Sequence, residues 1–175
     1  SRLSDIQAAA VRKVLGDRCF SKATLAINAG GAATVKTTGT KVFTIGGVFY
    51  SKAALAAQAI TPTHRFDGSP VSVANPAYVQ PALSTVFYVL ALNAAGTVAV
   101  VQGSYAGQVI RDGSDLSLVL TGTGEIPQEP DGYTAIGVIK VVTAGAATFT
   151  PGTTALDAAN VTATYHDVSV LPVSL

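Results

Sequence analysis

The chain has 175 residues, of which 49 % are hydrophobic and 12 % charged, and its net charge is +1. This length suits one well-buried domain, and the small net charge predicts no general attraction to nucleic acid. The mean hydropathy of +0.43 would suit a membrane protein. However, apolar runs such as Val86–Leu92 are much shorter than the roughly 18–20 residues of a spanning helix. We therefore expect a soluble protein that places its surplus apolar surface at subunit contacts.

The first 22 residues differ from the rest of the chain in charge and in pattern. They hold five basic and two acidic residues, a balance of +3, whereas the other 153 hold six and eight, a balance of −2. Ser4 and Gln7 form a capping box, and Gly16 is a helix stop, so a helix of about three turns is predicted. Its apolar stripe consists of Leu3, Ile6, Ala10, Val14 and Leu15. Such a short helix must pack on something. It is either an ordinary helix folded on its own body or an arm that docks on an acidic surface.

After residue 22 the pattern changes to short strands and turns. Strands are expected in 23–28, on both sides of Thr38-Gly39, in 84–103, 115–122 and 133–143, and in 160–170. The segment 84–103 is predicted to be a hairpin around "NAAG", and Gly46-Gly47 a turn or bulge. Residues 51–60 fit a helix or a strand, and the proline-rich segment Thr61–Pro81 is expected to be a long ordered loop.

Roughly eight strands without βα alternation predict an all-β fold, a jelly-roll-like β-sandwich with a short N-terminal helical arm. The expected division is a helical arm at 1–22 and a β-sandwich domain at 23–175. The strand 133–143 is apolar on both faces, with Ile136, Val138 and Lys140 on one and Ile139 and Val141 on the other. We expect Ile136 and Val138 to be buried by an opposing sheet or a neighbouring chain, with Lys140 at the rim.

The titratable residues form no motif for catalysis or metal binding. His64 and His166 are far apart in the sequence and lie in no metal-ligand spacing. Cys19 is the only cysteine, which excludes an intrachain disulfide and is typical of a small buried hydrophobic residue. The sequence "RDGSD" at 111–115 predicts a tight turn rather than a calcium loop. We expect no catalytic residue, cofactor or metal, and a protein that is not an enzyme.

Two long phrases of the chain carry a family resemblance. "TVFYVLALNAAGTVAVVQG" is followed by "IPQEPDGYTAIGVIKVVTAGAATFTPGTTALDAANVTATYHDVSVLP". Together with "VFTIGGVFYSKAA" they resemble a recurrent group of tailed-bacteriophage virion proteins over about residues 41–168. Members of this group are accessory structural proteins of the particle: head decoration or cement proteins, head fibres and tail-associated β-domains. The first 22 residues lie outside the resemblance, and no catalytic residue comes with it.

The resemblance implies a viral structural protein. We expect a capsid decoration (cement) protein that binds the major capsid protein, stabilises the head, and associates with itself as a homodimer or homotrimer. It would lie on the capsid surface of the virion after assembly in the bacterial cytoplasm, with no nucleic-acid or membrane partner. The residues predicted to bind the capsid are an apolar set and a basic set on the arm: Leu3, Ile6, Ala10, Val14 and Leu15, with Arg2, Arg12, Lys13 and Arg18.

Two alternatives stay open. One is a head or tail fibre domain whose Thr61–Pro81 loop binds glycan on the host surface. The other is a carbohydrate-active enzyme or lectin on the same sandwich, which requires a pocket with paired carboxylates. Its candidate residues are Asp112, Asp115, Glu125, Glu129 and Asp131.

Overall fold

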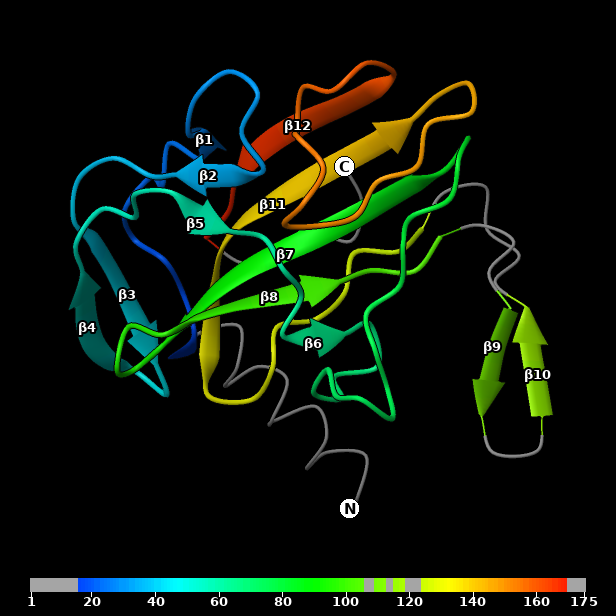
Figure 1. Cartoon of the computed structure of the whole chain (residues 1–175). Coiled ribbons are helices and arrows are strands. Elements are labelled where there is room, and N and C mark those ends of the chain that lie inside the picture. The colour runs from blue at the N-terminus through cyan, green and yellow to red at the C-terminus, as the bar shows by residue number, and fades with distance from the viewer. Residues whose placement is uncertain (1–15, 106–108, 113–114, 119–123, 170–175) are drawn as a thin grey trace.

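The computed structural model describes residues 16–105, 109–112, 115–118 and 124–169 (Figure 1). The described chain is nearly all-β, as predicted. In chain order its strands are β1 (Ala26–Ile27), β2 (Thr34–Lys36), β3 (Lys41–Ile45), β4 (Val48–Lys52), β5 (Gln58–Ala59), β6 (His64–Arg65), β7 (Thr85–Asn93), β8 (Val98–Gln102), β9 (Val109–Asp112), β10 (Asp115–Leu118), β11 (Tyr133–Thr143) and β12 (Val161–Asp167).

A five-stranded sheet with the order β12-β11-β7-β8-β6 forms the main layer (Figure 1). All neighbours are antiparallel except β6 and β8, which are parallel. The predicted hairpin is confirmed as β7 and β8, which pair from Leu92 and Val98 onward. Asn93 closes its turn, because its carbonyl accepts from Gly96 N at 2.9 Å and its Oδ1 from Thr97 N at 2.8 Å. This polar turn between two long apolar runs is what made the hairpin predictable.

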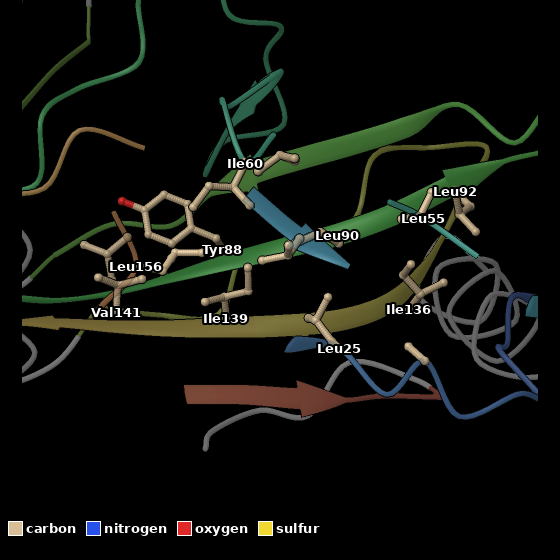
Figure 2. Packing of buried hydrophobic residues seen from close by; sticks show 14 of the residues in the cluster. Leu25, Leu55, Ile60, Tyr88, Leu90, Leu92, Ile136, Ile139, Val141 and Leu156 are labelled. Carbon is tan, nitrogen blue, oxygen red and sulfur yellow. The ribbon is translucent and has the colours of Figure 1, made fainter. Parts of the chain in front are cut away.

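One face of the main sheet is covered by the three-stranded sheet β1-β2-β5 and by the hairpin β3-β4 (Figure 1). Alternate residues of β7, including Tyr88 and Leu90, point into this core. Figure 2 shows Leu25, Leu55 and Ile60 lying opposite them. The short strands have room for few side chains each, so several of them are needed to cover the long strands of the main sheet.

The other face of the main sheet is also apolar and buried. Phe87 and Val89 of β7 point to this side, where they form a second cluster with Val101, Ala135 and Val138. Ile126 and Val168 pack against that cluster. Because β7 is buried on both faces, its sequence is a nearly continuous apolar run rather than a polar and apolar alternation.

A β-bulge in β11 changes the predicted side-chain pattern. Ala135 pairs with Ala91 and Gly137 with Leu90, so Ile136 is an extra residue on β11. Ile136 therefore packs in the larger core with Ile139, whereas Val138 packs in the second cluster. The predicted burial of Ile136 and Val138 is confirmed, but the prediction that they share a face is wrong. A glycine follows the bulge because the Leu25 side chain lies only 2.8 Å from where a Cβ on Gly137 would be.

The remaining predicted segments have mixed outcomes. Gly46 and Gly47 form a turn between β3 and β4, as expected. The ambiguous segment 51–60 is not a helix: β4 ends at Lys52, a loop follows, and β5 is Gln58–Ala59. The Thr61–Pro81 segment is mainly loop, with only β6 inside it. Asp112 pairs with Asp115, which agrees with the turn predicted at "RDGSD".

Candidate partner-docking site

The residues just after the N-terminal segment run along the outer edge of β3. Phe20 N donates to Val42 O at 2.8 Å, and Thr44 N donates to Arg18 O at 2.8 Å. Gly47 N donates to Gly16 O at 3.0 Å. The end of the segment predicted as an arm thus lies beside the β3–β4 hairpin as an additional antiparallel edge.

Strand-like alternation in this segment sends neighbouring side chains in opposite directions. Cys19, which is bridged to Phe43, is only 4 % exposed and belongs to the core. Phe20 points outward and is 57 % exposed, and Phe49 on β4 is 67 % exposed. The two outward rings contact each other with their centroids 5.5 Å apart. We call Phe20 and Phe49 the aromatic patch.

Phe49 is exposed because of the register of the hairpin. It lies opposite Thr44, whereas Tyr50 lies opposite Phe43 and stacks on it inside, with ring centroids 6.0 Å apart. Since side chains alternate across a strand, the half-buried Tyr50, which packs against the core, requires an outward Phe49. A contiguous pair of exposed phenylalanines on a paired strand is an unusual use of apolar surface and marks a candidate docking site.

Basic groups and a pocket adjoin the aromatic patch. Arg18 is half-buried, and Lys22 is exposed. A pocket of about 350 Å³ lies on the same side and contains one carboxylate, that of Asp167, which accepts from Leu25 N at 3.0 Å. The residues that line it are Cys19, Phe20, Ser21, Lys22, Asp167, Val168 and Ser169. The site can therefore bind an apolar side chain next to a charged or polar group.

The Cys19 thiol, one of the groups that line this pocket, is not built as a nucleophile. Burial raises the pKa of the thiol, and its Sγ donates to Ser21 O at 3.1 Å. The thiol is therefore neutral, and the thiolate is the reactive form of cysteine. Its buried position agrees with the sequence prediction.

The predicted capsid-binding residues fall into two groups. Eight of them lie outside the described residues: Arg2, Leu3, Ile6, Ala10, Arg12, Lys13, Val14 and Leu15. The ninth, Arg18, lies beside β3 in the same edge segment as Phe20, with its backbone bonded to Thr44. Phe20 and Phe49 were not predicted as site residues. Their aromatic character is visible in the sequence, but their exposure follows from strand pairing, of Phe20 with Val42 and of Phe49 with Thr44.

The histidines and acids do not assemble a reactive centre in the part of the chain that is described. His64 Nδ1 lies 2.9 Å from Thr63 Oγ1, and its ring meets the Tyr133 ring edge-on. His166 lies on β12, opposite Val138 of β11. His64 lies on β6, at the other edge of the main sheet. Across the described residues, no group of three or more His, Cys, Asp or Glu side chains is placed to hold a metal ion.

Comparison with known proteins adds no assignment. No family model matches the chain, and no curated protein or solved structure shows a significant similarity to it. Within the described ranges, no helix combines the length and the apolar character needed to cross a membrane.

Proposed function

We propose that the protein is a capsid decoration (cement) protein of a tailed bacteriophage, which binds the major capsid protein and stabilises the head. The observation that carries this proposal is the aromatic patch of Phe20 and Phe49, exposed at the point where the N-terminal segment joins the body. The resemblance of residues 41–168 to phage virion proteins supports the same function.

The energetics of such a site suit a protein that binds a shell in many copies. A phenylalanine buries about 200 Å², so covering the exposed parts of both rings removes on the order of 250 Å² from water. At about 25 cal/mol per Å² this corresponds to roughly 6 kcal/mol before the cost of association. One contact of this size is weak, but several contacts in one oligomer add up on a repeating lattice.

The proposal includes a structural division and a set of partners. The body at 23–175 is a jelly-roll-like β-sandwich, supported by a main sheet with a layer of smaller sheets on one face. The part of segment 1–22 that precedes residue 16 is the proposed helical arm, which contributes further capsid contacts through its apolar stripe and its basic residues, whereas residues 18–20 pair with β3. The protein is a homodimer or homotrimer on the capsid surface, assembled in the bacterial cytoplasm, where a chain with one cysteine needs no disulfide. It needs no cofactor, metal, nucleic acid or membrane and is not an enzyme.

The test is to add the purified protein to bare capsids and to image them by cryo-electron microscopy. We expect stoichiometric occupancy at symmetry-related positions, and an affinity at least about tenfold lower for the double variant Phe20→Ser/Phe49→Ser. Leu83→Ser is the control, because Leu83 is also a highly exposed apolar residue and lies outside the patch, in the loop before β7. Deletion of residues 1–15 tests the arm separately. Absence of binding by the wild type refutes the decoration function, and equal binding by the double variant refutes the patch.

A second candidate function is a fibre or tail-associated domain that binds host-surface glycan. The observation that favours it is a hydrogen-bonded turn in the Thr61–Pro81 loop in which Val73 is fully exposed. Ser72 and Asn75 close this turn, since each backbone N–H donates to the other's carbonyl at 3.1 Å. A glycan array decides between the two functions: a signal that is lost when residues 72–75 are replaced by a glycine linker supports the fibre domain.

A further inference from the structure

The outer edge of β4 is open. β4 pairs with β3 on one side, and the other strands of the described chain leave its second side without a partner. The edge carries Val48, which is 55 % exposed, and the outward Phe49. Lys52 is the only charge on the strand, and the strand contains neither proline nor a bulge. An edge with a single charge and neither proline nor a bulge has little to prevent its pairing with another strand.

The glycine turn determines which backbone groups are free on this edge. Gly46 and Gly47 both have positive φ, as a two-residue hairpin turn requires. In such a hairpin the flanking residues Ile45 and Val48 form a hydrogen-bonded pair, and such pairs then alternate along the strands. Thr44 should therefore direct its N–H away from β4, and it does so by donating to Arg18 O.

The same alternation applies to β4. Phe49 lies opposite Thr44 and Ser51 opposite Val42, so these two residues of β4 point their N–H and C=O groups away from β3. Each chain thus presents two donors and two acceptors, separated by one residue, Tyr50. This arrangement is self-complementary under a two-fold rotation.

We infer that β4 pairs antiparallel with β4 of a second copy of this chain, with Tyr50 on the two-fold axis. In this register Phe49 of each copy lies opposite Ser51 of the other. The pairing forms four backbone hydrogen bonds and uses every outward group of Phe49 and Ser51 on both chains. The hairpin becomes the centre of one continuous sheet across the dimer, in a symmetric contact of the commonest kind.

Charge and side-chain placement favour a second copy over an unrelated strand. Lys52 is at one end of β4, and Asp17 is at the other, where its Oδ1 accepts from Gly46 N at 2.6 Å. Antiparallel pairing brings the basic end of each copy to the acidic end of its partner. Phe49 of the two copies become diagonal neighbours, which is within reach of aromatic rings. The net charge of +1 adds little repulsion between copies.

The dimer would double the docking site. The two aromatic patches would form one row of four rings on the outward face of the shared sheet, and two linked patches bind a repeating shell more tightly than one. This consequence rests on the proposed capsid function. The pairing of β4 does not, and its test uses the purified protein alone, so that its failure and the failure of capsid binding are separate results.

The first test is the mass of the full chain in solution, measured by sedimentation equilibrium. We expect the wild type to be a dimer once its concentration reaches about 0.1 mM. The dissociation constant of the Ser51→Pro dimer should be at least about tenfold higher. Proline removes the outward N–H of Ser51 and is tolerated on an edge strand. Leu83→Ser, away from this edge, should leave the dimer unchanged. A monomeric wild type, or an oligomer that Ser51→Pro does not weaken, overturns the inference.

The second test reads the register and does not depend on the fold of the proline variant. Phe49→Cys and Ser51→Cys are prepared separately, mixed, and exposed to oxidised glutathione, which accepts the electrons of the two thiols. Residues in a hydrogen-bonded antiparallel pair have Cα atoms about 5.5 Å apart, a distance that a disulfide spans. We expect a covalent dimer in the mixture and little in either variant alone, with the buried Cys19 unreactive. No cross-link in the mixture, or equal cross-linking in the single variants, overturns the register.

Discussion

Substituting Gln80 should change the stability of the protein in a pH-dependent way. The side chain is completely buried, and its Nε2 donates to Val141 O at 2.9 Å and to Ser84 O at 3.2 Å. Its Oε1 accepts from the Tyr88 hydroxyl at 3.1 Å, and its backbone pairs with that of Phe149 in both directions. One residue thereby fastens the end of the proline-rich loop to the centre of the main sheet.

The informative change is Gln80→Glu, which exchanges an NH₂ group for an oxygen at nearly constant volume. An ionised carboxylate would be buried and would face the carbonyls of Val141 and Ser84, which are acceptors like itself. The folded protein therefore keeps the glutamic acid protonated, and the pKa of Glu at position 80 is raised above its unfolded value of about 4.3. A protonated acid donates one hydrogen bond where the amide donates two, a loss of about 1 kcal/mol at any pH.

The sign of the pH effect follows from the raised pKa. Below about pH 4.3 both the folded and the unfolded variant hold the proton, so the free energy of unfolding falls only by the contribution of the lost hydrogen bond. As the pH rises, the unfolded chain releases the proton and the folded chain does not, and the free energy of unfolding falls by about 1.4 kcal/mol per pH unit. At pH 7 the loss reaches about 4–5 kcal/mol if the acid stays protonated, which is a large part of the stability of a typical domain.

The assay is urea unfolding followed by circular dichroism at pH 4, 5, 6 and 7, with the wild type measured at each pH as the reference. Gln80→Ala is the matched control. It removes the same hydrogen bonds and leaves a cavity, so it should cost about 2–4 kcal/mol at every pH. A loss for Gln80→Glu that is equal at pH 4 and pH 7 would refute the buried network, because the carboxyl group would then be hydrated.

Three further changes test the core. Burial raises the pKa of the Tyr88 hydroxyl, so near pH 10 this group ionises only in the unfolded chain. The free energy of unfolding measured in urea should therefore fall from about pH 9 to 11, and it should fall less steeply in Tyr88→Phe. A Cβ at Gly137 would lie 2.8 Å from Leu25 Cδ2, so Gly137→Ala should cost about 1–3 kcal/mol in thermal unfolding; Gly30→Ala, with only a 3.9 Å contact, should stay within about 0.5 kcal/mol. Because its thiol is buried and neutral, Cys19 should react with a thiol reagent at least about a hundredfold more slowly in the folded protein than in urea; an equal rate would show that the site opens.

The long strands could be predicted from the sequence because their patterns extend over many residues. β7 and β8 each contain an apolar run, and the "NAAG" between them fixes both their order and their pairing. The two-residue strands β1, β5 and β6 were harder, since two residues have no period. β1 and β5 belong to the small sheet that covers the apolar face of the main sheet, and β6 pairs with the edge of β8, so all three depend on the folded chain.

The bulge in β11 shows a different limit. A regular strand would place Ile136 and Val138 on one face. The residues "AIGV" are apolar, so they fit a regular strand and a bulged strand equally well. Gly137 is the one local signal, because an isolated glycine inside a strand often marks a bulge. Without the position of Leu25 there is no reason to prefer the bulge to a regular strand. The docking site is hidden for a similar reason: the sequence shows Phe20 and Phe49, but the pairing of the Arg18 segment with β3 turns Phe20 outward, and the β3–β4 register does the same for Phe49.

The two buried faces of the main sheet also change where self-association is expected. From composition, the surplus apolar surface was assigned to subunit contacts, and β11 with its two apolar faces was the obvious place. The structure instead covers one face of β11 and β7 with the smaller sheets and packs Ile126 and Val168 on the other. The central strands therefore have little left to offer a partner. Among the described residues, the exposed rings of Phe20 and Phe49 contact each other at the β3–β4 hairpin, and the outer edge of β4, which also carries the exposed Val48, has no strand partner. The long strands are buried and a short aromatic edge is exposed, which is why we propose β4 rather than β11 as the place where two copies pair.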